Sequence, residues 1–327
     1  MRHIRLFIFA LTGCCFSSLV LADDAGIFAG DGTPQLVLSD GAGEGPAWDP
    51  KLGLLFSGHG NIMRMGRDGK VAVHREGAGT NGLLFDANGA LLACEPVRRR
   101  VTRTELDGAL TVLTEKFDGT AFNQPNDITV DSKGRIYFSD PQYGDRNKME
   151  MLDREGRKVE GVYRIDPDGK VTRLITHEVD RPNGLVVTAD DRFLFVADNN
   201  NSDVGGARKL WRFALQSNGS LDLTSQSLIY DWGASRGPDG MVLDAAGRLY
   251  VAGGVNQPNP NETNEKLGGV YVFSPDGELL TFVHIPRDEV TNCTFGGEDL
   301  KTLFVTAGGT LWSIHTTTPG QLPWPRR

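Results

Sequence analysis

The sequence contains little cysteine and no long basic run. Its 327 residues include 34 Lys and Arg against 42 Asp and Glu, which gives a formal net charge of −8. A nucleic-acid surface needs concentrated positive charge, so we expect no nucleic-acid partner. Only Cys94 and Cys293 lie beyond the first 22 residues, and no Cys/His spacing typical of zinc is present. We expect both cysteines to be buried free thiols, although export would also permit a disulfide.

Long apolar runs are lacking too, except near the N-terminus. Two arginines precede an apolar stretch over residues 6–21, and the small residue Ala22 follows it. Because this order is typical of a secretory signal, we predict a signal peptide over residues 1–22 and a mature domain over 23–327, exported to the periplasm. Two alternatives stay open. One is a membrane anchor, for which about 16 apolar residues are few; the other is a lipid anchor at Cys14, whose surroundings resemble a lipobox. No later segment is apolar enough to span a membrane.

Glycine, in contrast, is abundant, with 41 residues, and helical periodicity is nearly absent. Six segments repeat one pattern. A polar residue comes first and is usually followed by Gly or another small residue; an apolar strand, a short turn and a second apolar strand come next. The polar leading residues are Glu44, Asn81, Asn126, Asn183, Asp239 and Asn292. Five units carry a later Asp-Gly or Asn-Gly pair, a strong hairpin signal, at 68–69, 107–108, 168–169, 218–219 and 276–277. We therefore predict an all-β fold, a six-bladed β-propeller with four antiparallel strands per blade, rather than two β-sandwiches.

Three polar segments follow the second strands of their units. They cover residues 141–160, 199–209 and 253–267. If they gather at one end of the propeller they form a lid; the alternative is that each is an ordinary surface loop.

The innermost strands of a propeller surround a central channel, so a repeated position forms a ring. Every leading residue carries a side-chain oxygen, and two of the six are carboxylates. Because unpaired negative charge near the axis is unfavourable, we predict a divalent cation in the channel. We assign Glu44, Asn126, Asn183 and Asp239 as its ligands. Ca²⁺ suits such oxygen donors first, with Mg²⁺, Mn²⁺ or Zn²⁺ left open. The alternative is that Asn-Gly and Asp-Gly only begin strands as turn formers.

Several segments resemble the motifs of the senescence-marker-protein-30/gluconolactonase/luciferin-regenerating family. They are 44–48 (EGPAW), 122–127 (FNQPND), 140–144 (DPQYG), 181–184 (RPNG), 237–240 (GPDG), 291–297 (TNCTFGG) and 303–306 (LFVT). Residues 92–95 and 99–103 are most similar to bacterial gluconolactonases. The resemblance covers essentially the whole mature chain.

This resemblance implies a six-bladed propeller with a catalytic divalent ion, usually Ca²⁺, that hydrolyses sugar lactones. The family's metal ligands match Glu44, Asn183 and Asp239, and Asn126 contacts the metal or the substrate. Gln124 departs from the family pattern, because animal members carry a substrate-contacting Arg there. Their exact substrate therefore does not transfer to this chain. The positions that we expect to contact substrate are Asn81, Gln124, Asn126 and Asn292.

These observations predict a metal-dependent, gluconolactonase-like hydrolase that opens sugar lactones, acting as a monomer on a small-molecule lactone. The cation would polarise the carbonyl group, and either Asp239 or a metal-bound hydroxide would serve as the base. The alternative is a non-catalytic exported propeller that binds a sugar or a protein. The sequence around Ser235 matches the G-x-S-x-G nucleophile motif, but a strand rather than a helix follows it.

Overall fold

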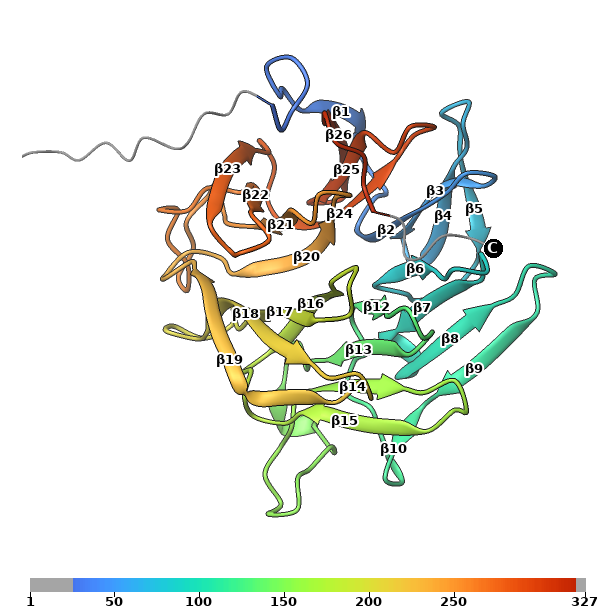
Figure 1. Cartoon of the computed structure of the whole chain (residues 1–327), viewed down its shortest axis with the longest axis vertical. Helices are drawn as coiled ribbons and strands as arrows, with labels where there is room; N and C mark the ends of the chain where they lie inside the picture. Colours follow the sequence, from blue (N-terminus) through green and yellow to red (C-terminus); the bar gives the residue numbers. More distant parts are fainter. Residues whose placement is uncertain (1–25, 322–327) are drawn as a thin grey trace, which may run out of the picture.

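Six four-stranded antiparallel sheets surround a common centre in the computed structural model, which describes residues 26–321 (Figure 1). The innermost strands are β2 (Glu44–Asp49), β6 (Leu83–Phe85), β12 (Ile128–Val130), β16 (Pro182–Val187), β20 (Pro238–Leu243) and β24 (Val290–Gly296), and each begins within two residues of one of the six leading residues. This arrangement confirms the predicted six-bladed propeller. The predicted signal peptide lies outside the described residues.

The strands follow one another outward within each blade. Blade 1 consists of β2 (Glu44–Asp49), β3 (Gly53–Gly58), β4 (Asn61–Met65) and β5 (Val71–Arg75). Blade 2 consists of β6 (Leu83–Phe85), β7 (Leu91–Glu95), β8 (Arg100–Thr104) and β9 (Leu110–Thr114). Blade 3 consists of β12 (Ile128–Val130), β13 (Ile136–Asp140), β14 (Gly161–Ile165) and β15 (Val171–Ile175).

The remaining blades complete the ring. Blade 4 consists of β16 (Pro182–Val187), β17 (Phe193–Asn199), β18 (Arg208–Leu215) and β19 (Leu221–Asp231). Blade 5 consists of β20 (Pro238–Leu243), β21 (Leu249–Gly253), β22 (Gly269–Phe273) and β23 (Leu279–His284). Blade 6 contains β24 (Val290–Gly296), β25 (Thr302–Ala307) and β26 (Thr310–His315). Minor elements are the hairpin β10 (Lys116–Phe117) and β11 (Thr120–Ala121) and the 3₁₀ turns Pro96–Arg98 and Arg146–Lys148.

The fourth strand of blade 6 comes from the other end of the described chain. Strand β1 (Gln35–Leu38) pairs antiparallel with β26, with Gln35 opposite Ser313. This pairing closes the ring, and it explains why the sequence shows the later hairpin pair in only five units. All five pairs lie between the third and fourth strands of their blades, and their glycines have φ between 76° and 95°, as the turns require.

Neighbouring blades pack through apolar side chains between their sheets. Between blades 2 and 3, for example, Phe122 shares a buried cluster with Leu92 of β7, and it meets both Phe138 and Tyr163 edge-on with ring centroids 5.1 Å apart. The same burial encloses the two cysteines, which are free and buried as expected. Within the described residues, no helix is long and apolar enough to cross a membrane.

The glycines after the leading residues serve a different purpose from the one that the sequence suggested. A Cβ atom on Gly184 would lie 2.0 Å from the carbonyl oxygen of Asp239, and one on Gly240 would lie 1.9 Å from Asn292. These glycines are therefore needed because adjacent inner strands nearly touch around the axis. The alternative that the Asn-Gly and Asp-Gly pairs at the leading residues are merely turn formers does not fit this close approach of the strands.

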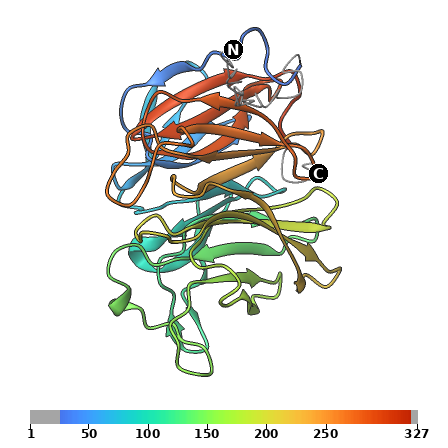
Figure 2. The ribbon, with the colours of Figure 1, turned by 90° about the vertical axis from the view of Figure 1, so that its left-hand side faces the viewer.

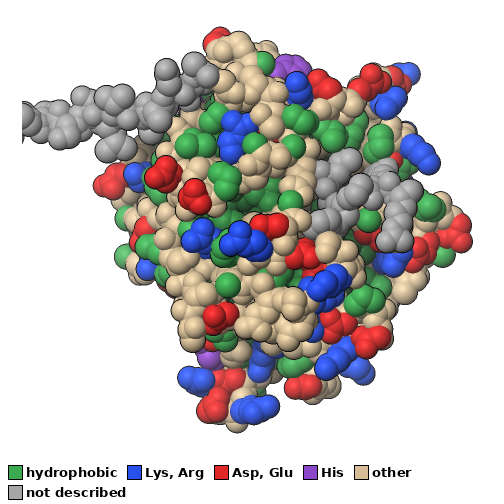
Figure 3. Space-filling view, in the orientation of Figure 1, with side chains coloured by type: hydrophobic (Ala, Val, Ile, Leu, Met, Phe, Trp, Pro, Cys, Tyr) green, Lys and Arg blue, Asp and Glu red, His purple; other side chains and the backbone are tan. Residues whose placement is uncertain are grey.

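The three polar segments form one continuous wall on blades 3, 4 and 5. Arg146 approaches Asp203 at 3.6 Å, and the Nδ2 atom of Asn261 donates to the carbonyl oxygen of Ser202 at 3.0 Å. The loop 141–160, green in Figures 1 and 2, extends outside the ring of sheets. On blades 6, 1 and 2 the corresponding connections are only short turns. Charges of both signs are interspersed over the face seen in Figure 3.

Candidate active site

The six leading residues meet at one end of the channel, on the side where the long loops lie. Glu44 begins β2, and the other members lie in or directly before the remaining inner strands. The Nδ2 atom of Asn292 approaches the Oε1 atom of Glu44 at 3.5 Å, and the amide of Asn183 interacts with the Asp239 carboxylate. We call these six residues the oxygen ring. The structure thus brings together all four predicted metal ligands, together with Asn81 and Asn292.

Local irregularities in the inner strands coincide with several of the ring residues. In β16, Pro182 pairs with Asp198 but Leu185 pairs with Val196, so Asn183 lies in a bulge. The same shift occurs in β20 around Asp239 and in β2 after Glu44. A bulge re-aims a side chain relative to the regular alternation of a strand. It therefore accounts for a polar residue at the start of an otherwise apolar strand.

Four oxygen atoms of the ring are buried and, within the described part of the chain, have no hydrogen-bond partner. They are Oδ1 of Asn81, Asn126, Asn183 and Asp239. Leaving a buried acceptor unpaired is unfavourable, and native proteins do it rarely. A divalent cation would satisfy several such oxygens at once, and a mixed set of carboxylate and amide oxygens is what Ca²⁺ binds. The ring residues therefore fit the cation that the sequence predicts.

The electrostatics of the ring point the same way. Burial raises the pKa of Asp239 to about 8; Arg236 opposes this rise and Asp127 adds to it. Burial, and then the charges of Asp239 and Asp127, raise the pKa of Glu44 well above its usual value. Negative charge is therefore unfavourable here unless a positive group accompanies it.

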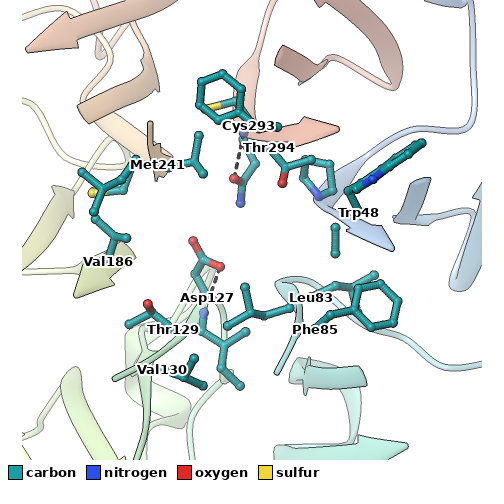
Figure 4. Close-up of a pocket in the computed structure, with 18 of the residues that line it drawn as sticks. Trp48, Leu83, Phe85, Asp127, Thr129, Val130, Val186, Met241, Cys293 and Thr294 are labelled. Carbon is teal, nitrogen blue, oxygen red and sulfur yellow. Dashed lines mark hydrogen bonds between the residues drawn. The ribbon is translucent and has the colours of Figure 1, made fainter. Parts of the chain in front are cut away.

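Asp127 is a buried carboxyl group that the sequence reasoning did not select. It follows Asn126 directly, and its Oδ1 atom accepts the backbone N–H of Ile128 at 2.9 Å. Burial raises its pKa to about 7. Figure 4 shows the carboxylate pointing into the channel. Its position beside a ring residue in the sequence was the only available signal.

Two of the predicted substrate contacts already use their side-chain oxygens within the protein. The Oδ1 atom of Asn292 accepts the N–H of Cys293 at 2.8 Å. The Oε1 atom of Gln124 accepts the backbone N–H of Tyr143 at 2.8 Å. Each amide is thereby fixed in orientation, and its oxygen faces the protein backbone.

Tyr143 also reaches the ring, although it lies in the loop 141–160. The Nδ2 atom of Asn183 donates to its hydroxyl group at 2.5 Å. The guanidinium group of Arg181 lies over its ring, 5.3 Å from the centroid. A loop residue of this kind carries no repeat signal, so the pattern that revealed the ring could not reveal Tyr143.

Beyond the ring, the channel becomes largely apolar. A cavity of about 110 Å³ lies between the inner strands, on the side of the ring opposite the loops 141–160, 199–209 and 253–267. Its lining includes Leu83, Phe85, Met241 and Phe295, and Figure 4 shows labelled side chains from several blades around it. We call this part the apolar end of the channel.

Ser235, from the nucleophile-like motif, does not lie in this site. It is buried beside the loop 253–267, where its Oγ atom accepts the N–H of Lys266 at 2.9 Å. Strand β20 follows it, so the strand-to-helix turn that exposes a nucleophile is missing here.

Comparison with known proteins shows the family and the fold of this chain. Residues 42–309 match the model of the SMP-30/gluconolactonase/LRE-like region. A gluconolactonase of Zymomonas mobilis is 31% identical over 286 residues, covering 84% of this chain and 72% of that protein. A solved gluconolactonase of Xanthomonas campestris superposes with a TM-score of 0.72 at 30% identity, covering 89% of this chain and 91% of the other. A calcium-binding regucalcin of Agrobacterium tumefaciens shares the fold, with a TM-score of 0.66 at 20% identity, covering 92% and 98%. The chain belongs to the SMP-30/gluconolactonase/LRE-like family.

Proposed function

We propose that this protein is a metal-dependent lactone hydrolase that opens sugar lactones, as its gluconolactonase relatives are named for doing. The observation that carries the proposal is a set of four buried oxygens in one ring that have no hydrogen-bond partner among residues 26–321. Glu44, Asn126, Asn183 and Asp239 would hold the cation, which we expect to be Ca²⁺, with Mg²⁺, Mn²⁺ or Zn²⁺ as alternatives.

Ring opening of a lactone requires stabilisation of the carbonyl oxygen, a water that loses a proton, and a route for the leaving alkoxide. A bound divalent cation supplies positive charge for the carbonyl oxygen. Asp239 is suited to accept the proton of the attacking water, because its Oδ1 atom is buried at the ring and has no protein partner among the described residues. Asn81 and Asn126 offer further acceptor oxygens to substrate hydroxyl groups at the same ring.

We also propose that the protein acts as an exported, periplasmic monomer.

The test is lactone hydrolysis followed with a pH indicator over a panel of aldonolactones, before and after chelation. Glu44→Gln keeps the shape of the side chain but removes its charge, so we expect loss of bound metal and of activity while the fold remains. Glu298→Gln is the matched control, because Glu298 is an exposed acid whose carboxylate contacts Arg67 at 3.4 Å. Full activity and metal content in Glu44→Gln would refute the site. A protein that binds sugars but hydrolyses no lactone would be a binding propeller instead.

A further inference from the structure

The side chain of Tyr143 anchors the loop 141–160 to the oxygen ring at Asn183. Asn183 is almost fully buried, with an exposed fraction of 3%. Its Nδ2 atom donates to the Tyr143 hydroxyl at 2.5 Å, while its Oδ1 atom has no partner within the described residues. An amide can present either its oxygen or its NH₂ group to a site. The Tyr143 hydroxyl and the Asp239 carboxylate both lie on the NH₂ side, which leaves the oxygen directed away from them.

Tyr143 is itself held by contacts to both its backbone and its ring. Its backbone N–H donates to the Oε1 atom of Gln124 at 2.8 Å, and its carbonyl oxygen accepts from the Nε2 atom of Gln142 at 3.1 Å. Arg181, only 1% exposed, covers the aromatic ring. These contacts fix both the backbone and the ring plane, so the hydroxyl group has little freedom.

Arg181 belongs to a buried ionic cluster that ties this arrangement to blade 4. Its Nε atom donates to Glu160 at 3.0 Å, and its Nη1 atom donates to the Oγ atom of Ser202 at 2.8 Å. Glu160 also accepts the backbone N–H of Gln142 at 3.0 Å. The contacts that connect the loops 141–160 and 199–209 therefore also support the aromatic ring of Tyr143.

We propose that Tyr143 is a positioning residue, which orients the Asn183 amide so that its oxygen faces the cation, and that Gln124 supports it by fixing the Tyr143 backbone. This inference rests on the proposed function. It also gives Gln124 a task that an Arg cannot perform at this position, because a guanidinium group has no acceptor for the Tyr143 N–H.

The test is Tyr143→Phe, which removes the hydroxyl group but keeps the ring under Arg181. Partners of metal ligands typically affect metal affinity by roughly 10–100-fold, so we expect the Kd for Ca²⁺, measured by calorimetry, to rise by about that factor. Activity should recover largely at saturating Ca²⁺, and the melting temperature of the metal-free protein should change little. Tyr137→Phe is the matched control. Its hydroxyl group also makes a buried hydrogen bond in blade 3, to Asp131 at 2.9 Å, but away from the ring.

A second variant tests whether Gln124 acts on the Asn183 amide through Tyr143. Gln124→Met removes the acceptor and should weaken Ca²⁺ binding less than Tyr143→Phe does. In the double variant it should add nothing, because Gln124 acts only through the hydroxyl group. If wild type binds Ca²⁺ and Tyr143→Phe binds it equally well, the positioning role is wrong while the proposed function stands. If wild type binds none of the four candidate cations, the proposed function fails, and this inference fails with it.

Discussion

The two ends of the central channel follow opposite rules of packing. At the apolar end, side chains such as Leu83 and Phe295 are at most 5% exposed, line the cavity and pack within buried apolar clusters. At the oxygen ring, buried acceptors have no partner within the described part of the chain, and two acids are brought close to each other. The first arrangement stabilises the fold, whereas the second destabilises it unless a cation is bound. Stability and function are therefore separated along one axis, within the same six strands.

The largest effect should come from removing the charge of Asp239 at the ring. Asp239→Asn keeps an oxygen that can bind a cation but removes the basic group. We expect kcat for lactone opening to fall by about 10²–10⁴-fold, the usual contribution of a general base, when measured at saturating Ca²⁺. Metal content should fall less than it would for an apolar replacement.

Asn183→Ala provides the opposite pattern and serves as the comparison for Asp239→Asn. It removes a neutral amide oxygen, so affinity for the cation should suffer more than the rate at saturation. If excess Ca²⁺ restores Asp239→Asn to nearly the wild-type rate, Asp239 acts only as a ligand and the base lies elsewhere.

Sequence reasoning reached the ring because its members repeat. A polar residue before each apolar strand recurs six times, and the propeller places those positions around one axis. The same reasoning missed Tyr143 and Asp127, since neither stands at the repeated position, and their roles depend on contacts between separate segments. It also missed the closure of blade 6 by β1, because the pairing of Gln35 with Ser313 joins distant parts of the chain. Patterns within repeats were predictable; contacts made once were not.

The pH dependence of stability should differ with and without metal. In the folded state burial raises the pKa of Asp239 to about 8 and that of Asp127 to about 7, against the ordinary value of 3.8. Between about pH 4 and 8 the folded protein therefore binds more protons than the unfolded chain. The free energy of unfolding of the metal-free protein then falls as pH rises.

This slope can be measured as the urea midpoint in chelator from pH 5 to 8.5. Saturating Ca²⁺ should reduce the fall, because it stabilises the ionised ring. Asp140 lies outside the ring, and burial raises its pKa to about 8, so its share of the slope should persist in Ca²⁺. A metal-free protein whose stability rises from pH 5 to 8 would contradict the unfavourable charge at the ring.

The smallest expected effect is a change in the free energy of unfolding of the metal-free protein. Its sign should differ between the apolar end of the channel and the oxygen ring. Ile128 is 4% exposed and lines the apolar end, so Ile128→Val should lower the free energy of unfolding by about 0.5–1.5 kcal/mol through lost packing. Glu44→Gln should instead raise the stability of the metal-free protein at pH 8. The neutral amide keeps an acceptor for the Gly45 N–H, which lies 2.7 Å from the Oε2 atom of Glu44, and it removes repulsion with Asp239. Adding Ca²⁺ should reverse the order of wild type and Glu44→Gln but leave the Ile128→Val difference unchanged. If both substitutions destabilise the metal-free protein equally, the ring is ordinary packing, and the contrast between the two ends of the channel is wrong.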